Sequence, residues 1–292
     1  MKRLFLVFFL LFLLSGCKPT DENVQNYILF EQDEFTIIKT KAENIKPETI
    51  REPLCSDYIR DLGYYGINAG FFNTVYRNEK PDDEDFVSVS ISWSKEDTEK
   101  GLEVCEVSKR DLERIALGES RYIARGTLFL YIYNENENEK YEAGIITAES
   151  VDDVKLQNGD FDYIYMIGGG NFYLSDYPNL EDWEKYKEKK YLGEGPLVME
   201  NNKYGRSGIG IKKENGIWYV YLVCSGINGE EIPKTLEELR ALFISLECSE
   251  AIYLDGAGSS QMRCLRDNGE LIEKSGDNRY IWSMVRLINL ND

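Results

Sequence analysis

The chain has 292 residues and a net charge of −18, with 34 Lys and Arg, 52 Asp and Glu, and no histidine. The acidic balance argues against non-specific binding to nucleic acid, which needs a basic surface. The absence of histidine excludes Ser-His and Cys-His catalytic pairs and histidine-ligated metal sites, so acid–base chemistry falls to Asp, Glu, Tyr, Lys or Cys. A hydrophobic content of 42% predicts a folded protein.

The amino terminus has the pattern of an export signal. Lys2 and Arg3 precede an unbroken apolar run over 4–14. This run is too short to span a bilayer, but it matches the hydrophobic region of a signal peptide. It ends in Leu14-Ser15-Gly16-Cys17, which resembles the lipobox of bacterial lipoproteins and implies cleavage before Cys17 and lipidation of its sulfur. The alternative is an ordinary signal peptide that ends near a cysteine.

These features predict a signal peptide over 1–16, a lipidated Cys17 with a tether reaching residue 30, and one domain over 31–292. The expected location is the bacterial cell envelope, with the protein held at the membrane by a palmitate-type anchor on Cys17. Cleavage removes Lys2 and Arg3 and no acidic residue, so the net charge becomes −20.

Strand patterns dominate the first half of the domain. Alternation or β-branched and aromatic runs predict strands over 86–93, 127–133 and 161–167, the last closed by three glycines. A hairpin is predicted over 207–224, because Asn215-Gly216 is a strong turn dipeptide.

Two helices are predicted in the second half. The segment 180–191 is highly charged and is interpreted as a solvated insertion. The segment 235–246 has a capping box of Thr235 and Glu238 and an apolar face at helical spacing. A short strand then ends at Asp255, and a final strand covers 280–288. The predicted fold is α+β, a single domain with a mixed twisted β-sheet core and a few flanking helices.

Five cysteines remain if Cys17 is lipidated, and their number is odd, so at least one thiol stays unpaired within the chain. Buried free thiols and a disulfide framework both remain open. The five are Cys55, Cys105, Cys224, Cys248 and Cys264.

Three separated segments carry residues suited to chemistry on an anionic ester. They are Gly66-Ile-Asn68-Ala69-Gly70-Phe71-Phe72-Asn73; Gly195-Pro-Leu-Val198 with Gly205-Arg206-Ser207-Gly-Ile-Gly210; and Leu254-Asp255-Gly256-Ala257-Gly258-Ser259-Ser260, with Arg279 downstream. Small residues beside a carboxylate let backbone N–H groups bind an anion, serine hydroxyls add donors, and arginine makes planar bidentate phosphate contacts. Taken alone, each glycine cluster is equally typical of a tight turn.

Together and in this order, the segments resemble the phosphodiester glycosidase family over about residues 60–290. The resemblance implies a hydrolase that cleaves the glycosidic bond of a sugar-1-phosphodiester, such as an N-acetylglucosamine-1-phosphodiester, in an envelope glycan or exopolysaccharide. The partners are then a phosphorylated glycan and, through Cys17, the membrane, but no nucleic acid. No cofactor or metal is expected. An alternative is a surface lipoprotein that binds phosphoglycans without cleaving them, and a third is a purely structural envelope lipoprotein.

The resemblance assigns catalytic roles to Asp255, Arg206, Arg279 and Asn68, and substrate binding to Gly70, Gly256, Gly258, Ser259 and Ser260. Asp255 would act as nucleophile, base or oxocarbenium stabiliser, while Arg206, Arg279 and the 256–260 backbone hold the phosphate.

Three positions depart from the family pattern: Ala69 and Ala257 stand where glycine is usual, and Tyr253 where a small polar residue is usual. An alanine at positive φ would cost about 1 kcal/mol. The acidic run 82–85 is typical of a solvated loop more than of a calcium site.

Overall fold

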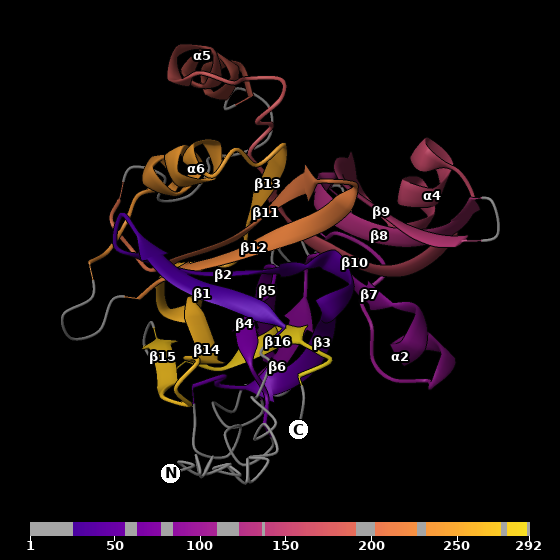
Figure 1. The fold of residues 1–292 in the computed structure, drawn as a ribbon, viewed down its shortest axis with the longest axis horizontal. Coiled ribbons are helices and arrows are strands. Elements are labelled where there is room, and N and C mark those ends of the chain that lie inside the picture. The colour runs from indigo at the N-terminus through magenta and orange to yellow at the C-terminus, as the bar shows by residue number, and fades with distance from the viewer. Residues whose placement is uncertain are drawn as a thin grey trace, which may run out of the picture.

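The computed structural model describes residues 26–55, 63–76, 84–109, 123–135, 138–190, 202–226, 232–275 and 279–290. Within them, two antiparallel sheets are joined into one body, with helices on the outer side of the larger sheet (Figure 1). The α+β single-domain prediction is confirmed. The sheets differ from the predicted mixed core, since every strand pair of the described residues is antiparallel.

The larger sheet runs in the order β1-β2-β12-β11-β13-β10-β8-β9, and β7 also pairs with β10. Its strands are β1 (Tyr27–Gln32), β2 (Phe35–Lys41), β12 (Ile217–Ser225), β11 (Arg206–Glu214), β13 (Glu250–Tyr253), β10 (Asp162–Asn171), β8 (Arg125–Glu135), β9 (Asn138–Ala148) and β7 (Ser92–Ser94). Because β1 begins at Tyr27, the end of the predicted tether is part of the sheet.

The smaller sheet runs in the order β15-β14-β4-β16-β3 and lies below the larger one in Figure 1. Its strands are β15 (Leu271–Ser275), β14 (Gln261–Leu265), β4 (Gly66–Asn68), β16 (Ile281–Leu287) and β3 (Ile45–Glu52), while β5 (Phe72–Tyr76) and β6 (Glu84–Ser88) form a separate pair.

The main core fills the space between the two sheets. Ile38, Leu222 and Ile252 of the larger sheet share one buried cluster with Ile67 and Val285 of the smaller sheet. Neighbouring side chains on a strand point to opposite faces, so Ile37 lies in a second cluster on the outer face. That outer face is covered by helices, which makes the architecture helix, sheet and sheet in three layers.

The helices are α2 (Lys95–Glu99), α4 (Val151–Asn158), α5 (Leu180–Lys190) and α6 (Leu236–Ser245). The capping box at the start of α6 is confirmed: the Glu238 N–H donates to Thr235 Oγ1, and the Thr235 N–H donates to the Glu238 carboxylate. The prediction of α5 as a solvated insertion was wrong in one respect. Trp183 is buried and packs edge-on against Phe172, so this helix is anchored to the outer core.

The hairpin prediction is confirmed, with positive φ at both turn residues, Asn215 (52°) and Gly216 (84°). Two other strands differ from prediction. The run 86–93 is split between β6 and β7 by a break at residues 89–91, and β10 continues through its three glycines to Asn171. The glycines are strand residues because neighbouring chains pass too close for side chains. A Cβ on Gly169, for example, would lie 2.5 Å from the Tyr253 carbonyl oxygen.

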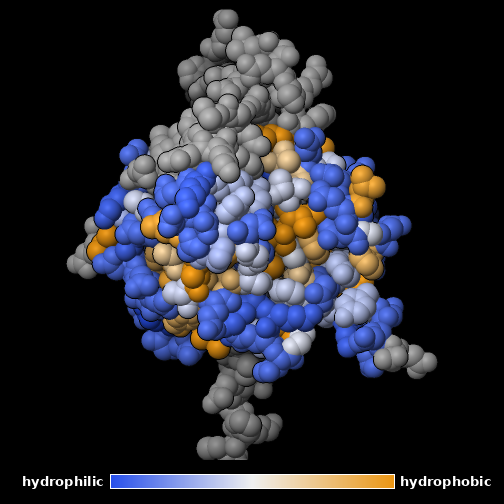
Figure 2. Space-filling view, turned by 90° about the horizontal axis from the view of Figure 1, so that it is seen from above, coloured by the Kyte–Doolittle hydropathy of each residue, from blue (hydrophilic) through white to orange (hydrophobic). Residues whose placement is uncertain are grey.

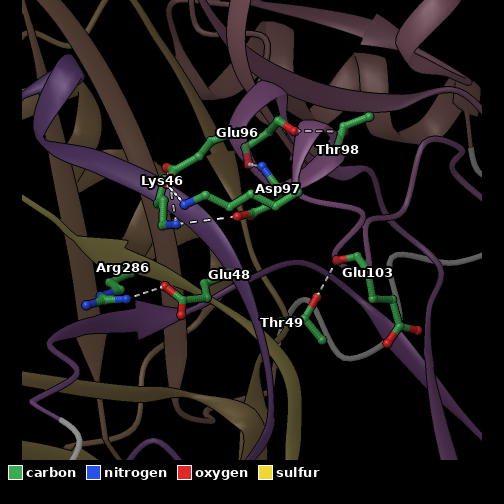
Figure 3. A network of polar contacts seen from close by, with 10 residues as sticks. Lys46, Glu48, Thr49, Glu96, Asp97, Thr98, Glu103 and Arg286 are labelled. Atoms are coloured by element: carbon green, nitrogen blue, oxygen red, sulfur yellow. Dashed lines mark hydrogen bonds and ion pairs between the residues drawn. The ribbon is translucent and has the colours of Figure 1, made fainter.

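A polar network ties β3 to its neighbours (Figure 3). The Lys46 ammonium lies 3.4 Å from the Asp97 carboxylate at the start of α2, and the Arg286 guanidinium lies 2.8 Å from the Glu48 carboxylate across β16 and β3. Thr49 donates to the Glu103 carbonyl oxygen. These contacts join the smaller sheet to the segment that follows β7.

The surface is largely hydrophilic, with separate apolar patches on the face shown in Figure 2. Among the described residues no helix is long and apolar enough to cross a membrane. Cys55 and four buried cysteines are free thiols, so the free-thiol alternative holds. The signal peptide, Cys17 and Gly195-Pro196 lie outside the described residues, as do residues 82–83 of the acidic run.

Candidate active site

The candidate site lies where the chain passes from the larger sheet to the smaller one. β13 ends at Tyr253, Asp255 follows, and a 3₁₀ turn over Ala257–Ser259 leads into β14. The Leu254 N–H donates to the Ser207 carbonyl, and the Asp255 N–H donates to the Ala69 carbonyl at 3.3 Å. Backbone from the first and second sequence motifs therefore fixes the position of the third.

Asp255 carries a half-buried carboxyl group. Burial raises the pKa of this carboxyl above its ordinary value, and the nearby Ser259 hydroxyl and the positive charges of Arg279 and Arg125 oppose the rise. One carboxylate oxygen accepts the Gly256 N–H at 3.1 Å. A carboxyl group with a raised pKa that is faced by cations is a typical arrangement for acid–base or nucleophilic work.

Asn68 connects the motifs and is completely buried. Its side-chain oxygen accepts from the Ser207 hydroxyl at 2.6 Å and from the Gln261 N–H at 3.0 Å, while its amide donates to the Asp255 carbonyl at 2.8 Å. Its hydrogen-bonding groups are thus engaged by protein. The structure places Asn68 directly behind Asp255, where it holds the backbone of that residue.

Arg206 begins β11 and is also buried. Its Nε donates to the Lys234 carbonyl at 3.0 Å and its Nη2 to the Asn202 carbonyl at 2.8 Å. Its remaining nitrogen faces the loop, since a Cβ on Gly256 would lie 3.6 Å from Nη1. Arg206 therefore lies against the Gly256 turn, and two of its three nitrogens donate to backbone carbonyls.

Two other guanidinium groups flank Asp255, and each lies over one ring of the Phe71-Phe72 pair. Arg279 is exposed, and its guanidinium carbon is 5.2 Å from the centre of the Phe72 ring. Arg125, at the start of β8, lies 4.9 Å above the Phe71 ring. Each guanidinium is held by cation–π contact with one ring of the pair, and both positive charges lower the pKa of the Asp255 carboxyl.

The glycine-serine loop, residues 256–260, has hydroxyl groups available to a ligand, whereas most of its backbone N–H groups already donate within the protein. The N–H groups of Gly256, Ala257, Ser259 and Ser260 all donate within the protein, which closes the turn. The Ser259 and Ser260 hydroxyls are buried and have no hydrogen-bond partner of normal geometry among the described residues. Buried hydroxyls without partners are uncommon and point to groups that a ligand completes. Gly258 is buried beside them.

A family model described as phosphodiester glycosidase matches residues 64–287, most of the chain. The chain belongs to the phosphodiester glycosidase family. The family predicted from the sequence is therefore confirmed, and hydrolysis of phosphodiester-linked sugars is the activity that this membership supports. No match was found among curated proteins.

Two solved structures illustrate how far the resemblance extends. The catalytic domain of zebrafish N-acetylglucosamine-1-phosphodiester alpha-N-acetylglucosaminidase, auto-inhibited by its pro-peptide, is 12% identical, with a TM-score of 0.48 over 90% of this chain and 81% of that one. A hypothetical protein from Synechocystis is 13% identical, with a TM-score of 0.41 over 89% and 61% of the two chains.

Within this phosphodiester glycosidase, Gly70 and Tyr253 shape the site by close packing. A Cβ on Gly70 would lie 2.2 Å from the Gly168 carbonyl oxygen, so the end of β4 can approach β10 only with glycine there. The Tyr253 ring lies over Gly170 and contacts Phe71 edge-on at 5.8 Å between centroids. The departure from the family pattern at Tyr253 thus adds an aromatic wall to the site.

Of the two alanines that replace the usual glycines, only Ala257 has a left-handed backbone, with φ of 53°. Ala257→Gly should therefore raise the free energy of unfolding by about 1 kcal/mol, because glycine adopts positive φ without steric cost. Ala69 is not at positive φ and is buried, so Ala69→Gly should lower the free energy of unfolding. Urea unfolding of both variants measures whether each free energy rises or falls. An increase in both would contradict the proposed strain at Ala257.

Arg125 and Gln261 are the two site residues without an assigned role in the sequence analysis. Gln261 is fully buried, donates to the Arg279 carbonyl at 2.7 Å and accepts the Leu54 N–H at 2.8 Å, so it fixes the backbone of Arg279. Gln261 directly follows the glycine-serine loop in sequence and could have been found there. Arg125 stands apart from the three motifs, and only the pairing of β8 with β10 brings it to the site.

Proposed function

We propose that this protein hydrolyses the glycosidic bond of a sugar-1-phosphodiester, with an N-acetylglucosamine-1-phosphodiester-like group in an envelope or exopolysaccharide glycan as substrate. The observation that carries the proposal is the position of Asp255, a half-buried carboxyl flanked by the guanidinium groups of Arg279 and Arg125. The carboxyl suits a sugar carbon that gains positive charge, and the cations suit the adjoining phosphate.

The reaction breaks the bond between C1 of the sugar and the bridging oxygen. The electron pair of that bond stays on the phosphate, which leaves as a phosphomonoester with one more negative charge. Water supplies a hydroxyl group to C1, and its proton is released. Because the phosphomonoester is a good leaving group, the step needs little general acid, and one carboxylate beside C1 can act as nucleophile, base or oxocarbenium stabiliser.

The test is release of free sugar from a panel of sugar-1-phosphodiesters by the purified protein, with simple aryl glycosides of the same sugars as controls. We expect turnover of at least one phosphodiester and none of the matched neutral glycosides. Saturable binding of the panel without turnover would instead support a phosphoglycan-binding protein, and neither binding nor turnover would contradict both functions.

We further propose that the mature protein is anchored in the cell envelope through a lipid on Cys17. The basis is the sequence of the amino terminus, where a short apolar run ends in Leu14-Ser15-Gly16-Cys17. Cells that express the protein in the presence of a labelled palmitate analogue should yield a labelled, membrane-associated product. Cys17→Ser should abolish the label, and a labelled Cys17→Ser product would contradict the anchor.

A further inference from the structure

Arg125 is half-buried, and it differs from fully buried Arg263, whose Nε lies 3.1 Å from the Glu273 carboxylate. The Arg125 Nε is buried and has no hydrogen-bond partner among the described residues, and the Arg125 Nη2 reaches the Lys109 carbonyl only at 3.4 Å. Arg206 and Arg240, by contrast, each donate from Nε and Nη2 to backbone carbonyls. A buried charged donor that lacks a partner is costly, so a residue held in this state indicates that an anion completes it.

The carboxylate of Asp255 is not that missing partner. It is near enough for the two charges to influence each other, yet no salt bridge joins Arg125 to any carboxylate of the described residues. The Nε of Arg125 is therefore a charged donor without an acceptor, and the adjacent Nη2 makes only the long contact with the Lys109 carbonyl. A side chain with planar, paired N–H groups is suited to a phosphate oxygen pair more than to a single hydroxyl.

The groups around Arg125 fix its direction. Its guanidinium carbon lies 4.9 Å from the centre of the Phe71 ring, and Phe71 is itself held because its N–H donates to the Ser90 hydroxyl at 3.0 Å. The buried Ser259 hydroxyl lies close enough to the Asp255 carboxyl to lower the pKa of that group, although the two make no hydrogen bond of normal geometry. Asp255 thus has two neighbouring donors, the Arg125 Nε without an acceptor and the Ser259 hydroxyl without a hydrogen bond of normal geometry, and an anion could accept from both.

We propose that Arg125, together with the Ser259 hydroxyl, binds the phosphate of the substrate and stabilises the charge that phosphate gains as the C1–O bond breaks. The inference rests on the proposed function and makes it more specific. Arg125 thereby takes the phosphate-binding role expected of Arg206, whose Nε and Nη2 already donate to backbone carbonyls. Arg279, which is exposed, adds a second positive charge near Asp255.

The test measures binding of methyl phosphate, a mimic of the phosphomonoester product, by isothermal titration calorimetry. Arg125→Gln should weaken binding by roughly 10- to 100-fold, the range expected for hydrogen bonds to a charged group. Arg125→Lys should recover part of the loss, since it keeps the charge without the paired donors. Ser259→Ala should weaken binding by a smaller factor.

Arg266→Gln is the matched control. Arg266 follows β14 at the end opposite Gln261 and is half-exposed, with Glu270 and Glu31 near its guanidinium, so its loss should leave methyl phosphate binding unchanged. Far-ultraviolet circular dichroism should confirm that each variant is folded. Unchanged binding by folded Arg125→Gln, or an equal loss for free N-acetylglucosamine and methyl phosphate, would overturn the proposal.

Binding and turnover separate this inference from the proposed function. If the wild-type protein binds methyl phosphate through Arg125 yet releases no sugar from any phosphodiester, the phosphate site stands and the hydrolase proposal fails. If sugar is released and Arg125→Gln retains both wild-type kcat/KM and wild-type phosphate binding, the hydrolase stands and the role of Arg125 is refuted.

Discussion

Asp255→Asn is expected to abolish sugar release while leaving the protein at least as heat-stable as the wild type. The amide keeps the shape of the side chain but supplies neither a nucleophile, a base nor a negative charge beside C1. Loss of a group that acts in the transition state typically lowers kcat/KM by roughly 10³-fold or more. The assay is sugar release from whichever phosphodiester the wild type turns over.

The expected gain in stability follows from the raised pKa of the Asp255 carboxyl. A carboxyl whose pKa is higher in the folded than in the unfolded state binds more protons when folded. Its ionisation therefore lowers the free energy of unfolding as pH rises from the unfolded to the folded pKa. Above that window the wild type carries the full cost of a buried charge, whereas Asp255→Asn does not, so the Tm of the variant should be higher at neutral pH.

The same shift predicts the pH profile of activity. If ionised Asp255 is the active form, kcat/KM should fall as the pH is lowered. The midpoint of that fall should lie above the ordinary pKa range of an aspartate. Because the positive charge of Arg125 lowers this pKa, Arg125→Gln should move the fall to higher pH. Asp162→Asn is the control, since Asp162 is an exposed partner of Lys95 and its loss should leave both turnover and the pH profile unchanged.

Full turnover by Asp255→Asn would show that Asp255 takes no part in the reaction.

Asn68→Ala is expected to give the largest loss of stability among the site substitutions. The Asn68 side chain satisfies three separate groups, namely the Ser207 hydroxyl, the Gln261 N–H and the Asp255 carbonyl. Alanine would leave all three without this partner in a buried region. Each unsatisfied buried group costs about 1–3 kcal/mol, so a total of about 3 kcal/mol or more is expected in urea unfolding.

Activity of Asn68→Ala should also fall, because Asp255 loses the contact that fixes its backbone. Asn158→Ala is the matched control: Asn158 lies at the end of α4, and its amide makes one hydrogen bond, to the Val154 carbonyl at 3.0 Å. It should cost less than about 1 kcal/mol and leave turnover intact. Equal losses in the two variants would show that Asn68 has no special positioning role.

Local sequence signals predicted the elements that depend on local chemistry. Asn215-Gly216 accepts positive φ at both positions, so it fixed the hairpin, and the pair Thr235 and Glu238 marked the start of α6. The placement of Asp255 just after a short strand was also predictable, because β13 is an apolar run that stops at an acid. In each case the residues that determine the structure are neighbours in the chain.

Features that depend on distant contacts were not predictable from one sequence. The three glycines of β10 are typical of a turn in sequence, yet they are strand residues because Ile91 and Tyr253 pack closely against them. Trp183 belongs to a highly charged segment that predicts a solvated helix, but its ring packs on Phe172. Arg125 has no motif around it, and it reaches Asp255 only through the pairing of β8 with β10.

The proposed reaction breaks the glycosidic C–O bond and not the P–O bond. Turnover of a sugar-1-phosphodiester in ¹⁸O-labelled water, followed by mass spectrometry of both products, distinguishes the two directly. Cleavage of the glycosidic C–O bond would place the label in the free sugar and none in the phosphomonoester. Label in the phosphate would mean that water attacks phosphorus, and it would contradict the assignment of Asp255 to chemistry at the sugar carbon.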